Sequence, residues 1–121
     1  IAMIETAEGI ANADEIMSTA GLNGVYIGPA DLALSLGLPA MGDQPQEEHL
    51  FVVKDLLAKC KAHGIAAGIH TSSLEYAQKY LALGFNFVTL GSESGHMTKN
   101  ASAELAAARG GVASERENTG Y

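Results

Sequence analysis

Two acidic residues, Glu5 and Asp31, carry the clearest chemical signal in the sequence. Each follows a short apolar run, residues 1–4 before Glu5 and residues 24–28 before Asp31. If both runs are strands of one parallel sheet, both carboxylates reach the edge where the strands end, which is where α/β proteins bind ligands. Two carboxylates with polar neighbours suit a hard divalent cation such as Mg²⁺ or Mn²⁺. A helix cap and a solvated acid at a strand end are the alternative interpretation.

The segment around Asp31 predicts an anion site beside that cation. Gly28-Pro29-Ala30-Asp31 is typical of a helix start, because proline fits the first turn. A helix N-terminus presents free N–H groups and a partial positive charge. A 2-oxo acid could then chelate the cation through its carbonyl and one carboxylate oxygen while the amides hold the other oxygen. The cation would act as a Lewis acid that stabilises an enolate. A plain turn is the alternative for Gly28 and Pro29.

The histidines and the single cysteine add one further candidate. His70 closes a third apolar run at the same predicted edge, so we expect it to contact substrate, with a merely hydrogen-bonded histidine as the alternative. His49 and His63 lie on or at the end of a predicted helix and are expected to be solvated. Cys60 falls on that helix's apolar stripe and is expected in the core. The sequence has no Ser-His-Asp order, P-loop, GxGxxG or CxxC motif.

Four repeats of strand, polar strand end, helix and glycine position these residues. We expect strands at 1–4, 24–28, 65–70 and 85–91, and helices at 6–20, 29–36, 46–63, from about 73 to 83, and from about 96 to 109. Ser72 and Glu75 have the spacing of a capping box. Near-continuous apolar strands are typical of a parallel sheet buried on both faces. The fold class is therefore α/β, either a small open domain or half of an eight-stranded barrel.

Composition narrows the class of protein. The 121 residues suffice for one small domain, and 47% of them are hydrophobic. A formal charge of −7 argues against nucleic acid or an anionic membrane as a general partner. We find no membrane span and no signal peptide, and one cysteine fits a reducing, cytoplasmic setting. The chain begins inside a strand pattern without methionine, so we expect a fragment of a longer protein. Residues 110–121 are expected to form a flexible tail.

Several motifs together resemble the HpcH/HpaI aldolases, metal-dependent class II aldolases of the citrate-lyase-like superfamily. The matching segments are MIETAEG at 3–9, NADEI at 12–16 and GVYIGPADL at 24–32, and the likeness continues at 64–71 and 80–91. The interval from Glu5 to Asp31 also resembles the family's, and the two motifs in register are far more specific than either alone. The resemblance implies a (β/α)₈ TIM barrel, of which residues 1–109 are the C-terminal half, the last four βα units.

The resemblance also implies roles for individual residues. Glu5 and Asp31 match the two metal-ligating carboxylates, for Mg²⁺ or Mn²⁺ with Co²⁺ as a further candidate. The segment that holds the carboxylate of pyruvate matches Gly28, Pro29, Ala30 and Asp31. Met3 falls where some relatives carry a substrate-contacting glutamine, and His70 falls where relatives have an apolar residue on the aldehyde side. The family's catalytic histidine and arginine come from early strands, so no catalytic residue is assigned in this chain.

The resemblance predicts that the parent protein is an oligomeric, cytoplasmic aldolase. It would cleave a 4-hydroxy-2-oxo acid, such as 2,4-dihydroxyhept-2-ene-1,7-dioate or a 2-dehydro-3-deoxy sugar acid, to pyruvate and an aldehyde. We expect this fragment alone to be inactive or nearly so, and its open edge strands to pair two copies. One alternative is an acyl-CoA lyase of the same superfamily, although seven Lys and Arg supply no obvious basic surface. The other is a non-catalytic α/β binding domain.

Overall fold

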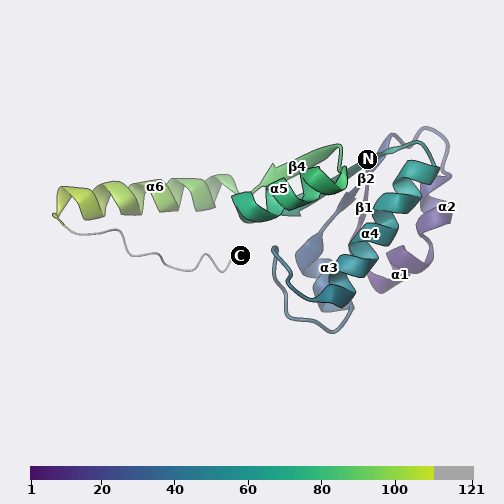
Figure 1. Ribbon diagram of the computed structural model, residues 1–121, viewed down its shortest axis with the longest axis horizontal. Helices are drawn as coiled ribbons and strands as arrows, with labels where there is room; N and C mark the ends of the chain where they lie inside the picture. Colours follow the sequence, from purple (N-terminus) through teal and green to yellow (C-terminus); the bar gives the residue numbers. More distant parts are fainter. Residues whose placement is uncertain (111–121) are drawn as a thin grey trace. The chain divides into compact units, whose positions relative to one another are not determined.

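The computed structural model describes residues 1–110, so the predicted tail lies outside the described residues except for Gly110. Residues 1–90 form one compact unit, and the described residues from Gly91 to Gly110 belong to a second. Strands and helices alternate along the first unit (Figure 1), in the order β1 (Ala2–Ile4), α1 (Ala7–Ala11), α2 (Ala13–Met17), β2 (Gly24–Ile27), α3 (Pro29–Ser35), α4 (Glu47–Ala62), β3 (Ala66–Thr71), α5 (Leu74–Leu83) and β4 (Phe87–Leu90). The second unit contains α6 (Glu93–Ala108).

The four strands form one parallel sheet in the order β1-β2-β3-β4. Ile4 pairs with Ile27, Ile27 with Ile69, and Ile69 with Val88. Each strand is thus followed by helical chain and then by its parallel neighbour, which is the arrangement of consecutive βα units. The α/β class with a parallel sheet, predicted from the sequence, is confirmed.

The two faces of this sheet differ. The side chains that join the core form the covered face, which consists of Ile4, Val25, Ile27, Ala67, Ile69 and Val88. They are buried against α2, α4 and α5 through residues such as Met17, Leu56 and Tyr80. The alternate residues form the open face, which consists of Met3, Glu5, Tyr26, Gly28, Gly68, His70, Phe87 and Thr89. The expectation of strands buried on both faces is therefore met, within the described residues, on one face only.

This asymmetry follows from the connections between the strands. Parallel strands joined through helices cross over with one hand, so successive helices return to the same side of the sheet. In a closed barrel the other side faces the remaining strands. Residues 1–110 supply four strands, and their open face keeps apolar side chains such as Met3, which is 57% exposed.

The observed helices agree with those predicted from the sequence except in three respects. The helix expected over 6–20 is two short helices separated at Asn12, whose φ of −99° and ψ of 12° leave the helical range. The cap of α5 is Ser73, whose side chain accepts from the Tyr76 amide, and not the predicted Ser72. The Ser72 amide donates to Asp43 Oδ1 at 2.8 Å. The last helix begins three residues earlier than expected, after Ser92.

Gly84 ends α5 as predicted and has a φ of +100°, a conformation that favours glycine. The other predicted stops also have positive φ, namely Gly21, Gly37 and Gly64. In the second unit, α6 is capped by the Ser92 side chain, which accepts from the Gly95 amide, and none of its residues is buried. No helix within residues 1–110 has the length and hydropathy that a bilayer crossing requires.

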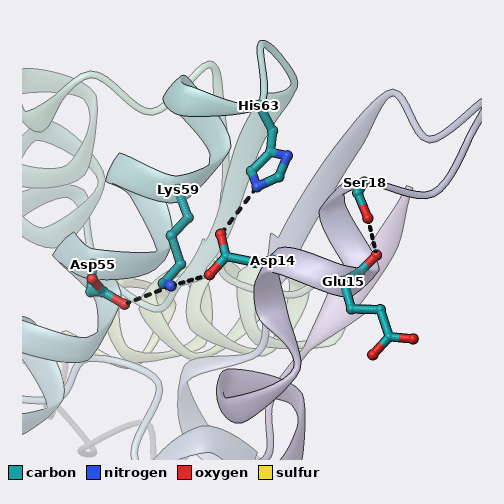
Figure 2. Close-up of polar contacts among 6 residues, drawn as sticks. All are labelled: Asp14, Glu15, Ser18, Asp55, Lys59 and His63. Atoms are coloured by element: carbon teal, nitrogen blue, oxygen red, sulfur yellow. Dashed lines mark hydrogen bonds and ion pairs between the residues drawn. The ribbon is translucent and has the colours of Figure 1, made fainter.

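A charged cluster joins α2 to α4 and consists of Asp14, Asp55, Lys59 and His63 (Figure 2). Asp14 accepts from Lys59 Nζ at 2.5 Å and lies 3.1 Å from His63 Nε2. These hydrogen bonds, first from Lys59 and then from His63, lower the pKa of Asp14. The hydrogen bond with Asp14 in turn raises the pKa of Lys59. His63 is thus a partner of Asp14, with 26% of its side chain exposed, and is not simply a solvated residue.

Candidate functional site

The register places four residues of the open face in one row at the carboxyl end of the sheet. Glu5 follows the Ile4–Ile27 pair by one residue on β1, and Gly28 follows it on β2. His70 follows Ile69 on β3 and pairs directly with Thr89 on β4. The row Glu5, Gly28, His70, Thr89 therefore crosses all four strands at the edge where the sequence predicted the site.

The Glu5 side chain leans over Gly28, toward the start of α3. A Cβ atom at Gly28 would overlap Oε2 of Glu5, so the carboxylate occupies the space that the missing side chain leaves. Asp31 lies in the first turn of α3 and is exposed. Within residues 1–110 no hydrogen bond or ion pair holds either carboxylate. Neither carboxylate therefore has a protein partner in the described part of the chain.

The described residues hold no group of three or more His, Cys, Asp or Glu side chains that could surround a metal ion. A cation bound here would have Glu5 and Asp31 as its side-chain ligands. Magnesium and manganese commonly keep water or substrate oxygens in the remaining positions, so a two-carboxylate set fits them. The donor set is all oxygen, which is the preference of a hard cation.

A buried histidine on α4 supports the first turn of α3. Gly28 is its N-cap, with an extended backbone and no side-chain cap, and Pro29 and Ala30 are buried at the first turn. His49, on α4, lies 3.1 Å from the Pro29 carbonyl through Nε2, and burial lowers its pKa. Because a carbonyl only accepts, neutral His49 donates its Nε2–H to Pro29.

The expectation that His49 is solvated is wrong, because its side chain is completely buried. The sequence did contain a signal for this burial. His49 stands four residues before Val53 and seven before Leu56, on the same helical stripe that ends at Cys60. Cys60 itself is buried in the core, as predicted.

Met3 and His70, the other predicted contacts, both lie on the open face. Met3 pairs with Tyr26 and is largely exposed, and it lies two residues before Glu5 on the same face of the sheet. The Nδ1 atom of His70 lies 2.9 Å from Thr89 Oγ1, and that oxygen lies 2.5 Å from the Tyr26 hydroxyl. Sequence analysis missed Tyr26 and Thr89, because they are 63 residues apart and no local pattern links them.

A family model described as HpcH/HpaI aldolase/citrate lyase matches residues 1–100. The chain belongs to this family. The hydroxypyruvate/pyruvate aldolase of Rhizorhabdus wittichii is 39% identical over 109 residues, which are 90% of this chain and 43% of that protein. This chain thus spans less than half the length of that curated relative.

Solved structures agree with this assignment. An HpcH/HpaI aldolase/citrate lyase family protein from Burkholderia cenocepacia matches with a TM-score of 0.80 and 28% identity, over 88% of this chain and 41% of the other. The citrate lyase beta subunit of M. tuberculosis, complexed with oxaloacetate and magnesium, matches with a TM-score of 0.63 and 25% identity, over 78% and 47%. The family and the α/β class, as part of a TIM barrel, are confirmed.

Proposed function

We propose that this chain provides the metal-binding and oxo-acid-binding half of an aldolase site. The parent enzyme would cleave 4-hydroxy-2-oxo acids to pyruvate and an aldehyde with a divalent metal ion, Mg²⁺ or Mn²⁺. The observation that carries the proposal is the corner formed by Glu5, Gly28 and Asp31, where the Glu5 carboxylate leans toward the start of α3 and both acids lack protein partners. The relatives named as aldolases support the reaction class.

Each residue of the corner has a distinct part in this proposal. Glu5 and Asp31 bind the cation, which would supply Lewis acidity for the negative charge that develops on the oxo-acid oxygen. The amides of Ala30 and Asp31, in the first turn of α3, hold the substrate carboxylate, since first-turn N–H groups have no partner within a helix. His49 supports this turn through the Pro29 carbonyl.

The magnesium and oxaloacetate in the citrate lyase beta subunit structure support the same ligand chemistry, because oxaloacetate is itself a 2-oxo acid. Met3 and His70, on the open face, would line the remainder of the substrate site. Proton transfer is assigned to no residue of this chain. We therefore expect residues 1–121 to bind metal and pyruvate without turning over substrate.

Calorimetric titration of this chain with Mn²⁺ and pyruvate tests the proposal. We expect pyruvate to bind only with the metal present, and Glu5→Gln or Asp31→Asn to weaken that binding at least about tenfold, because each removes one charged ligand. Glu15→Gln is the matched control, since Glu15 is an exposed acid on α2 whose side chain points away from the other residues drawn in Figure 2.

Two results would contradict the proposal. One is pyruvate binding of equal strength without any divalent ion. The other is unchanged metal-dependent binding in both the Glu5 and Asp31 variants. A circular dichroism spectrum matching the wild type would show that a loss of binding is local to the site.

A further inference from the structure

Gly68 creates room for an aromatic pair on the open face. It lies between Tyr26 and Phe87 in the sheet, since it pairs with both. The two rings stack with their centroids 5.7 Å apart and their planes at 12°. A Cβ atom at Gly68 would overlap the Phe87 ring, so only glycine leaves the stack undisturbed. The stack holds the Tyr26 ring, and with it the direction of the Tyr26 hydroxyl.

The Tyr26 hydroxyl begins a chain of hydrogen bonds across three strands. It lies 2.5 Å from Thr89 Oγ1 on β4, and the same oxygen lies 2.9 Å from His70 Nδ1 on β3. The Thr89 hydroxyl has a single proton, so it donates to one partner and accepts from the other. A phenol is a stronger acid than an alcohol and hence the better donor. This favours Tyr26 donating to Thr89, and Thr89 donating to His70 Nδ1.

We propose that Tyr26 and Thr89 are positioning residues that keep the proton of His70 on Nε2, and that His70 donates this N–H to an oxygen at the far end of the substrate. If Nδ1 accepts a hydrogen bond, the neutral ring must carry its proton on Nε2. That nitrogen is on the side of the ring away from the Thr89 contact. The substrate part of this inference rests on the proposed function.

The place of His70 in the row determines which part of the substrate it meets. Neighbouring strands are about 4.8 Å apart, so β3 lies roughly 10 Å from β1. Glu5 directly follows β1, so its backbone is about this far from that of His70. An oxo acid held at Glu5 and Asp31 would therefore present to His70 a group several bonds beyond its carbonyl. The substrate class is a 2-oxo acid with a hydroxyl or carboxylate oxygen in the portion that becomes the aldehyde.

Nitrogen-15 NMR of the His70 ring in this chain tests the positioning. We expect a protonated Nε2 and an Nδ1 resonance typical of a nitrogen that accepts a hydrogen bond. Thr89→Val should move the Nδ1 resonance toward that of an unbonded nitrogen, Thr89→Ser should restore it, and Tyr26→Phe should shift it in part. Tyr76→Phe is the matched control, because Tyr76 lies on α5 among residues packed against the core. A proton on Nδ1, or an Nδ1 resonance unmoved by Thr89→Val, would overturn the positioning role.

Binding measurements with Mg²⁺ test the substrate class. The probes are 2-oxoheptanoate and its 7-hydroxy derivative, which have equal charge and differ in one terminal oxygen. We expect the hydroxylated acid to bind between about twofold and tenfold more tightly, the worth of one added hydrogen bond. His70→Leu and Thr89→Val should bring this ratio close to one, whereas Tyr76→Phe should keep the wild-type ratio; because the ratio compares two ligands of one variant, a general loss of folded protein would not change it.

The outcomes separate this inference from the proposed function. Metal-dependent pyruvate binding with equal affinity for the two seven-carbon acids overturns the role of His70 alone. Absence of any pyruvate binding overturns the proposed function and the substrate part of this inference together. The NMR result decides the hydrogen-bonded chain in either case, because it needs neither metal nor substrate.

Discussion

The covered and open faces are built from alternate residues of the same four strands, yet they are held in different ways. On the covered face Ile4, Ile27 and Ile69 are each at most 1% exposed and are enclosed by helices. On the open face Met3 is 57% exposed, and the polar residues are held by one another or by nothing in the described chain. Packing therefore fixes the side chains of the covered face. On the open face, hydrogen bonds fix only Tyr26, His70 and Thr89 among the polar residues.

This difference shows which residues can be substituted to alter ligand binding without disturbing the core. Side-chain direction alternates along a strand, so a residue of the open face can be replaced without touching the core. Glu5 and Ile4 are neighbours in sequence, but they belong to different environments. The helices packed on the covered face position the strand ends, while the open-face side chains determine what those ends can bind.

The largest effect we predict is for Ile27→Ala compared with Met3→Ala. Ile27 is buried at the centre of the covered face, so its truncation should lower the free energy of unfolding by about 2–5 kcal/mol. Met3 is exposed, so its truncation should cost about 0.5 kcal/mol or less. Urea denaturation of the two variants measures both values. Similar losses at the two positions would mean that the open face is packed as tightly as the covered face.

A smaller effect is expected for Gly68→Ala on the open face. The new methyl group would overlap the Phe87 ring, and the ring can turn away because it is only partly buried. We expect a loss of about 1 kcal/mol, at the lower end of the range for overpacking, together with loss of the ring-current shifts of the Tyr26–Phe87 stack. The measurements are urea denaturation and proton NMR.

The control for this prediction is the same substitution in a Phe87→Leu background. A leucine side chain leaves more space over Gly68, so the added methyl group should then cost little. If Gly68→Ala is equally costly with leucine at 87, backbone conformation rather than the aromatic pair explains the requirement for glycine.

Much of this architecture could be predicted from the sequence. Short apolar runs located all four strands, and the polar residues near the ends of these runs located the edge at which Glu5 and His70 lie. The helix start at Pro29 and the core position of Cys60 followed from proline chemistry and helical spacing. These features depend on local patterns, which a single sequence displays.

The remaining features depend on contacts between distant segments. Tyr26, Thr89 and His70 meet only because the register of three strands brings them together. The Ser72 amide donates to Asp43, 29 residues away, and Ser73 caps α5 in place of Ser72. His49 contacts the Pro29 carbonyl, 20 residues away, although its helical spacing alone already indicates that it is buried. No local spacing pattern in the sequence predicts these contacts between distant segments.

The smallest predicted effect concerns the charged cluster, which adds polar contacts between α2 and α4 to the packing of their buried residues (Figure 2). Asp14 is 64% exposed in its side chain, so solvent weakens its contacts with Lys59 and His63. Its lowered pKa nonetheless has a definite consequence for pH dependence. A carboxyl whose pKa is lower in the folded state stabilises the fold above its unfolded pKa, and this stabilisation is lost as the pH falls through the folded value.

We therefore expect the difference in melting temperature between wild type and Asp14→Asn to be a few degrees at pH 5 and to shrink as the pH falls below about 4. High salt should also shrink it, because the cluster is exposed. Asp55→Asn is the matched control, since Asp55 lies 4.0 Å from the same Lys59 Nζ and should matter less. A difference that persists unchanged to pH 2 would show that Asp14 acts through helix packing, in which case α2 would be held, like the covered face, by shape rather than by charge.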